Sequence, residues 1–285
     1  MDKDIKKVAV GAAKKAGKML LKEYQNFDRT EVKLKHHREI LTRADLLSEE
    51  LIIKEISQSF PHHRILSEEI GMLENGYRKN IQVVAGRTPT LTSAARSVAR
   101  GIPASTYLWI IDPVDGTTNF SMHNPIWSIS IGVAYESKIV LGVVYAPVLD
   151  ELYIAEKGKG VKLNGRKIKV SNIKDKALNT FCHAREDKHV RQALKYYSYQ
   201  KMHGLDCRQM GSAAIELGFV AAGRTESIAI PGANAWDVAA GVLLVREADG
   251  KVTDFSGQEW NLESVDMLAS NGKVHNEILK VLNRK

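Results

Sequence analysis

The chain of 285 residues is 44% hydrophobic and 26% charged, which is ordinary for a globular protein with one large domain or two closely joined ones. No apolar run approaches the roughly 18 residues that a membrane helix needs, which excludes a membrane-spanning protein. The net charge of +8 is local, because the stretch between Asn75 and Ile111 has five lysines and arginines and no acidic residue. Such a local excess disfavours a chain-wide nucleic-acid surface and is compatible with an anionic small substrate.

The first half of the chain is expected to consist of two helices followed by antiparallel strands. Apolar residues at helical spacing predict the helices, while alternating residues and glycine-containing turns predict the strands. In chain order, these elements are helices over residues 4–24 and 44–57, strands over 64–67, 126–134 and 139–145, and a hairpin over 151–170.

The second half alternates strands with helices. The predicted elements are a strand over 181–184, helices over 187–197 and 211–222, a strand over 227–230, a helix over 235–248, strands over 251–253 and 266–269, and a helix over 274–282. A strand meander followed by alternation predicts a layered α/β (α+β) fold. We expect a single unit over 1–285, with one sub-domain over 1–180 and a second over 181–285.

One segment, Val83 to Thr106, differs in composition from its surroundings. It consists largely of Ala, Arg, Ser, Thr, Val, Gly and Pro, with no acidic residue and no clear apolar periodicity. These properties predict an inserted surface loop.

The most informative stretch runs from Trp109 to Phe120, with the sequence WIIDPVDGTTNF. An apolar strand over Leu108–Ile111 is expected to stop at Asp112, because Pro113 cannot extend the hydrogen-bond ladder. Asp115 follows, so two carboxylates are expected at the carboxyl end of a strand, where open α/β sheets bind ligands.

Gly116, Thr117 and Thr118 then resemble a helix start with free backbone amides. Carboxylates for hard cations beside amides suited to phosphate predict a metal-dependent phosphate site. On this segment alone, an ordinary strand-to-turn connection is an equal alternative, because Asp, Pro and Gly are common turn residues.

Four more acidic residues stand at expected element ends. Glu68 and Glu69 follow the strand over 64–67, Asp45 begins the second helix, and Asp237 begins the helix over 235–248. Taken singly, each is explained as a helix cap or a solvated strand end.

Taken together, these blocks resemble the inositol monophosphatase family, the lithium-sensitive, Mg²⁺-dependent sugar phosphatases, including its dual inositol monophosphatase/fructose-1,6-bisphosphatase type. The matching blocks are Thr42–Asp45, Glu68–Glu69, Asp112–Phe120, Gly211–Ala213, Trp236–Gly241 and Glu247–Gly250. The resemblance covers most of the chain. It implies an αβαβα sandwich with two sub-domains, a homodimer, and a small phosphate monoester as substrate.

The resemblance implies two to three Mg²⁺ ions. Glu68, Asp112 and the carbonyl of Val114 would hold the first ion. Asp112, Asp115 and Asp237 would hold the second, and a third would join at Glu68. Water and phosphate oxygens would complete the octahedra that Mg²⁺ demands.

It also implies catalytic roles. Thr117, paired with Asp45, would orient and help deprotonate the attacking water, and Glu68 is also counted among the catalytic residues. The amides of Gly116 and Thr117 would cradle the phosphate. Glu69 would stand behind the metal ligands and support them.

The substrate pocket is implied to include Gly211, Ser212, Ala213 and Asn234. The chain departs from the family at one position: inositol phosphatases place a hydroxyl-binding glutamate seven residues before the Trp-Asp aspartate, where this chain has Ile230. This departure argues against strict inositol specificity and favours a broader sugar phosphatase.

Individual residues and segments favour or disfavour the alternative functions. Fructose-1,6-bisphosphatase activity stays open, while 3′(2′),5′-bisphosphate nucleotidase activity is disfavoured because that branch carries a lysine where this chain has Thr118. A regulatory member that binds RNA or the transcription machinery is an alternative of another class, although the basic stretch lacks interleaved aromatic residues. Two cysteines without metal spacing and no apolar N-terminal signal region predict a cytoplasmic protein.

Overall fold

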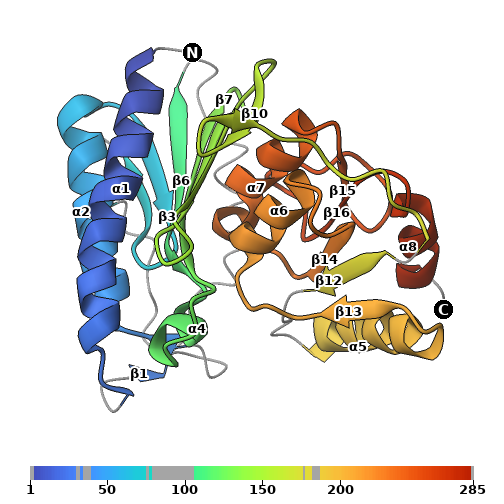
Figure 1. Cartoon of the computed structure of the whole chain (residues 1–285). Helices are drawn as coiled ribbons and strands as arrows, with labels where there is room; N and C mark the ends of the chain where they lie inside the picture. Colours follow the sequence, from blue (N-terminus) through green and yellow to red (C-terminus); the bar gives the residue numbers. More distant parts are fainter. Residues whose placement is uncertain are drawn as a thin grey trace.

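The computed structural model describes residues 3–29, 33–34, 40–74, 77–78, 106–175, 177–181 and 187–283. Five layers follow one another, alternately helical and sheet (Figure 1). From one side to the other they are α1 (Lys3–Asn26) with α2 (Arg43–Ser59), a nine-stranded sheet, α6 (Ala213–Ala221) with α7 (Ala235–Glu247), a five-stranded sheet, and α5 (Asp187–Met202) with α8 (His275–Leu282). The predicted αβαβα sandwich is confirmed.

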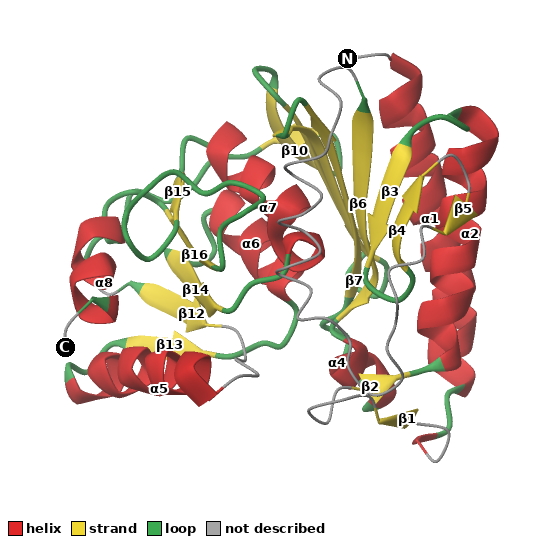
Figure 2. Cartoon of the chain, turned by 180° about the vertical axis from the view of Figure 1, so that it is seen from behind, coloured by secondary structure: helices red, strands yellow, loops and turns green. Residues whose placement is uncertain are grey.

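The large sheet has the order β11-β10-β9-β8-β7-β6-β3-β4-β5. Its strands are β3 (Arg64–Ser67), β4 (Gly71–Glu74), β5 (Tyr77–Arg78), β6 (Tyr107–Asp115), β7 (Ser128–Tyr135), β8 (Lys138–Ala146), β9 (Glu151–Glu156), β10 (Gly160–Leu163) and β11 (Arg166–Lys167). From β6 to β11 it is the predicted antiparallel meander, whereas β3 runs parallel to β6. The short strands β1 (Lys33–Leu34) and β2 (Ile40–Leu41) pair separately, and β2 lies next to α4 (Thr117–Ser121) (Figure 2).

The small sheet has the order β13-β12-β14-β16-β15. Its strands are β12 (Leu178–Phe181), β13 (Asp206–Arg208), β14 (Ser227–Pro231), β15 (Lys251–Thr253) and β16 (Asp266–Ser270). The strand predicted over 181–184 was placed too late: it begins at Leu178, and residues 182–184 lie outside the described residues. The division into sub-domains stays a prediction, and the chain passes from one sheet to the other between Lys167 and Leu178.

The helix α7 is buried almost throughout because it lies between the two sheets. Its sequence, AWDVAAGVLLVRE, is apolar on all sides except at its ends, as a helix without a solvent face requires. Glycine permits its close approach to β8, where a Cβ atom at Gly142 would lie 2.5 Å from the Ala240 carbonyl oxygen. The position of this helix in the sandwich is therefore fixed by backbone contact as well as by apolar burial.

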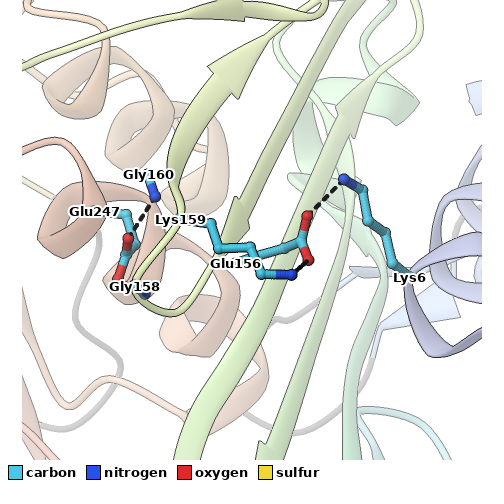
Figure 3. Close-up of polar contacts among 6 residues, drawn as sticks. All are labelled: Lys6, Glu156, Gly158, Lys159, Gly160 and Glu247. Atoms are coloured by element: carbon cyan, nitrogen blue, oxygen red, sulfur yellow. Dashed lines mark hydrogen bonds and ion pairs between the residues drawn. The ribbon is translucent and has the colours of Figure 1, made fainter. Parts of the chain in front are cut away.

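The turn between β9 and β10 is tied to helices on both faces of the large sheet (Figure 3). Glu247, the last residue of α7, accepts hydrogen bonds from the amides of Gly158 at 2.8 Å and Gly160 at 2.7 Å. On the other face, Glu156 pairs with Lys6 of α1 at 2.6 Å and with Lys159 at 2.9 Å. The Glu247–Gly250 block thus has a structural role in this chain.

The structure corrects one expectation about β6. The strand does not stop at Asp112 but continues to Asp115, because Asp112 pairs with Ser130 and Asp115 with Ser128. Pro113 lies in the irregular segment between these pairs, where the ladder needs no amide donor.

Two further expectations concern the chain as a whole. The loop predicted over 83–106 lies outside the described residues, apart from Thr106. No described helix is long and apolar enough to cross a membrane.

Candidate active site

The bulge in β6 places two carboxylates at one end of the large sheet. Between the pairs Asp112–Ser130 and Asp115–Ser128, β6 contains one residue more than β7, which makes a β-bulge. Asp112 is 2% exposed, and its Oδ1 accepts a hydrogen bond from the Val114 amide at 3.1 Å. The parallel neighbour β3 ends beside it, and the Glu68 amide continues the ladder by donating to the Ile111 carbonyl at 3.2 Å. Sheet pairing therefore brings Glu68 next to Asp112.

Asp45 reaches this site from the first turn of α2. Its Oδ2 accepts hydrogen bonds from the Thr42 amide at 2.8 Å and the Thr42 hydroxyl at 2.6 Å, which caps the helix. Its Oδ1 accepts from the Thr117 hydroxyl at 3.0 Å, and the same hydroxyl lies 3.0 Å from the Val114 carbonyl oxygen. The predicted pair of Thr117 and Asp45 is therefore in hydrogen-bond contact.

Asp115 joins the large sheet to the start of α6. Its carboxylate accepts hydrogen bonds from the hydroxyls of Ser128, at 3.2 Å, and Ser212. It also accepts from the amides of Ala213 at 3.1 Å and Ala214 at 3.0 Å, at a helix end that favours negative charge. Ser212 was predicted to line the substrate pocket, but its hydroxyl is buried and directed at Asp115.

Gly116 packs tightly against the loop before α6. Its φ angle is +91°, and a Cβ atom there would lie 3.0 Å from the Ile126 carbonyl oxygen and 3.1 Å from that of Gly211. Only glycine adopts this φ angle without strain and has no Cβ atom to crowd these two carbonyl oxygens. Beside it, the Asn119 side chain donates to the carbonyls of Ile126 at 2.6 Å and Met210 at 2.8 Å. The residues implied to bind phosphate and those implied to bind substrate are thus in contact.

Asp237 enters the site from the first turn of α7. Its Oδ2 accepts hydrogen bonds from the Asn234 amide at 3.2 Å and the Asn234 side chain at 3.1 Å. Asn234 was predicted to bind substrate, and in this structure its side chain caps α7 through Asp237.

Burial and mutual repulsion dominate the electrostatics of the site. Burial raises the pKa of Asp112 well above its usual value, and the charges of Glu68 and Asp115 raise it further, with contributions from Asp237 and Asp45. Burial likewise raises the pKa of Asp45 to about 6 and that of Asp115 to about 6, against the lowering effect of their hydrogen bonds. Four of the predicted acidic residues therefore lie close enough to Asp112 to repel its charge.

The donor set fits Mg²⁺ in chemistry and location. Among the described residues, no three His, Cys, Asp or Glu side chains form a group that could hold a metal ion as they lie. Asp237, one of the proposed ligands, has one carboxylate oxygen bonded to the Asn234 side chain. Carboxylate and carbonyl oxygens are nevertheless what Mg²⁺ prefers, and a cation would relieve the repulsion that raises the pKa of Asp112.

Three supporting residues were missed from the sequence. The Glu49 Oε1 accepts hydrogen bonds from the amides of Glu69 at 3.1 Å and Ile70 at 3.2 Å. The Ser48 hydroxyl donates to the Pro113 carbonyl at 2.9 Å. Glu216 accepts amides of the loop before α6. A signal was present for Glu216, the one charged residue in an otherwise apolar helix, and for Glu49, which lies one turn after Asp45.

Comparisons with known proteins agree over the whole chain. Residues 1–285 match the model of the inositol monophosphatase family. The Nus factor SuhB of Pasteurella multocida is 37% identical over 277 residues, covering 95% of this chain and 93% of that protein. The fructose-1,6-bisphosphatase/inositol-1-monophosphatase of Thermotoga maritima is 34% identical over 270 residues, covering 95% of this chain and 92% of that protein. The solved structure of a Thermotoga maritima IMPase has a TM-score of 0.81 at 32% identity and covers 98% of this chain and 97% of that one.

Proposed function

The chain belongs to the inositol monophosphatase family and is a phosphomonoesterase, and we propose that it hydrolyses inositol 1-phosphate or a related sugar phosphate with Mg²⁺. The observation that supports this proposal most is the contact of Thr117 with Asp45 beside the buried Asp112. This arrangement combines a hydroxyl, a base and clustered oxygen ligands, as metal-assisted hydrolysis of phosphate requires.

We assign the ions to the predicted ligands. Glu68, Asp112 and the Val114 carbonyl would hold one ion, and Asp112, Asp115 and Asp237 a second, with a third at Glu68. Bound Mg²⁺ supplies charge neutralisation of the phosphate and a lowered pKa of a coordinated water. By the same family resemblance, we propose a homodimer that lithium inhibits.

The chain's own residues would handle the proton and the phosphate. The Thr117 hydroxyl donates to Asp45, so an oxygen lone pair of Thr117 is left to accept a hydrogen bond from the attacking water. Because the pKa of Asp45 is about 6, it is an ionised acceptor at neutral pH. The amides of Gly116 and Thr117 would hold phosphate oxygens. Glu69, proposed to support the metal ligands, donates a backbone hydrogen bond to the Glu49 carboxylate.

The substrate is proposed to be broader than inositol 1-phosphate. Ile230 occupies the place of the family's hydroxyl-binding glutamate, and in β14 its side chain is 3% exposed within the central core. A buried isoleucine offers no hydrogen bond, so an inositol hydroxyl would lack a charge-assisted bond of about 1.5–3 kcal/mol. The name of the Thermotoga maritima relative, which includes fructose-1,6-bisphosphatase, supports the same proposal.

Phosphate release from a panel of substrates tests the proposal. With Mg²⁺, we expect kcat/KM for fructose 1,6-bisphosphate to rival that for inositol 1-phosphate, and adenosine 3′,5′-bisphosphate to be a poor substrate. Ile230→Glu is the matched variant and should shift the ratio towards inositol 1-phosphate. A preference of the unmodified protein for inositol 1-phosphate above about a hundredfold, or roughly 2.7 kcal/mol, would reject the broad specificity.

A second candidate function is that of a Nus factor, the description carried by the relative from Pasteurella multocida. The local excess of basic residues between Asn75 and Ile111 favours this candidate. RNA binding measured over a range of salt concentrations separates it from catalysis, because the Asp112→Asn variant should lose phosphatase activity and keep any RNA affinity.

A further inference from the structure

Glu216 is an acidic side chain in a helix that is otherwise apolar. Every other residue of α6 is apolar or glycine, and the Glu216 side chain is 0% exposed. Burial raises its pKa to about 8 in spite of hydrogen bonds that lower it. Burying an acidic group costs stability unless its partners compensate, so its contacts indicate what it does.

Its contacts are with the loop that precedes α6. The Glu216 Oε1 accepts hydrogen bonds from two successive backbone amides, those of Met210 at 3.3 Å and Gly211 at 3.1 Å. Gly211 has a φ angle of +83°, a conformation that other residues rarely adopt. One side-chain oxygen therefore fixes both amides at the point where the loop turns into the site.

This loop contacts Asn119, the proposed metal ligand Asp115 and the proposed phosphate-binding residue Gly116. The Asn119 side chain holds the Met210 carbonyl at 2.8 Å, and the Ser212 hydroxyl donates to Asp115. The Gly211 carbonyl oxygen lies 3.1 Å from where a Cβ atom of Gly116 would be. A displacement of the loop would therefore reach both Asp115 and Gly116.

We propose that Glu216 is a positioning residue of the phosphatase site, which holds Met210 and Gly211 so that Asp115 and Gly116 keep their catalytic geometry. This inference rests on the proposed function. It assigns Glu216 no contact with substrate or metal, because its hydrogen bonds are to the two loop amides and to the Thr180 side chain. The effect expected on removal is misplacement of catalytic groups, which lowers the rate more than substrate binding.

The test compares Glu216→Leu and Glu216→Gln with a matched control, Glu226→Leu. Glu226 is also buried, at 3% exposed, and accepts the Leu178 amide at 2.6 Å and the Ser171 hydroxyl at 2.9 Å. We expect Glu216→Leu to lower kcat roughly 10- to 100-fold with a smaller change in KM. Glu216→Gln keeps an acceptor oxygen and should retain most of kcat. Glu226→Leu should lower Tm by as much as Glu216→Leu and leave kcat within about threefold.

Amide hydrogen exchange gives a readout that does not depend on activity. Faster exchange at Met210 and Gly211 in Glu216→Leu, but not in Glu226→Leu, supports the positioning role. Unchanged exchange at these two amides, or equal loss of kcat in both leucine variants, overturns it. If the unmodified protein releases no phosphate from any substrate, the proposed function fails, while the exchange measurement still decides whether Glu216 holds the loop.

Discussion

The helix α7 carries an acidic residue at each end, and the two differ in the charges that surround them. Asp237, in its first turn, faces a group of carboxylates and raises the pKa of Asp112. Glu247, its last residue, accepts two backbone amides of the turn between β9 and β10. Both acids accept two hydrogen bonds, but only Asp237 also lies near like charges that repel it.

The two surroundings have opposite effects on the free energy of unfolding. Carboxylates that raise one another's pKa destabilise the folded chain at neutral pH, whereas a carboxylate that accepts two amides stabilises it. The acidic end is nevertheless held in place by the bulge in β6, the Asp45 cap and the bonds between Asp115 and α6. The sandwich therefore supports a repulsive cluster of the kind that active sites need.

The largest effect should follow Asp112→Asn. An amide holds Mg²⁺ poorly, so we expect loss of Mg²⁺-dependent phosphate release by more than about tenfold, with several kcal/mol of transition-state stabilisation removed. The same change removes the charge at the centre of the repulsive cluster, so the Tm of the metal-free protein should stay the same or rise. Retention of a tenth or more of kcat would reject the metal assignment. Asp237→Asn should behave alike.

Thr117→Ala should have the next largest effect. It removes the hydroxyl that is proposed to link Asp45 to the attacking water. A positioned proton acceptor typically raises the reaction rate about 10²–10⁴-fold. We expect kcat to fall more than KM, because the substrate contacts stay in place. Thr118→Ala is the control, since Thr118 is exposed and should tolerate the change. Equal effects of the two variants on kcat would contradict the role of Thr117.

Most residues of the candidate site could be named from the sequence, because they lie in or beside elements that apolar periodicity locates. Asp45, Asp112 and Asp237 each adjoin a strand or helix that the apolar pattern marks. Family resemblance then supplied their roles. The bonds from Asp115 to α6 could not be predicted, because they join residues almost 100 positions apart and depend on how two layers pack.

The bulge in β6 was missed for a related reason. Pro113 ends a ladder by the usual rule, but the partner strand β7 skips this residue and resumes pairing at Asp115. Such a register shift is decided by the neighbouring strand and leaves no local pattern. The missed strand β13 has only three residues, too few for a period to be recognised.

The pH dependence of stability should report the repulsive cluster in metal-free protein. Burial raises the pKa of Asp45 from 3.8 to about 6. This carboxyl therefore loses its proton at a higher pH in the folded state than in the unfolded state. This term therefore lowers the free energy of unfolding as pH rises from 4 to 6, by on the order of 3 kcal/mol. Denaturant titrations of the unmodified protein and of the Asp45→Asn variant should diverge accordingly, because the variant lacks the titrating carboxyl and escapes this loss over that range.

Comparing the two proteins also cancels an opposing term. Burial lowers the pKa of His275 to about 4, so the stability it contributes is lost as pH falls from about 6.5 to 4. Both proteins contain this histidine, so their difference reports Asp45 together with its effect on Asp112. A constant difference between them from pH 4 to 7 would contradict the raised pKa.

The smallest effect should come from the other end of α7. Glu247→Ala removes two hydrogen bonds to amides of a partly exposed turn, so we expect a loss of about 1–2 kcal/mol and a Tm lower by about 2–6 °C. Glu156→Gln is the control, because the Lys6 end of its ion pair is exposed and glutamine keeps an acceptor oxygen, so we expect a loss of about 0–1 kcal/mol. Both variants should keep kcat within about twofold, since neither residue contacts the carboxylate cluster. A fall in kcat for Glu247→Ala would show that the two ends of α7 are coupled. A loss of Tm no greater than that of Glu156→Gln would show that the two hydrogen bonds do not stabilise the turn.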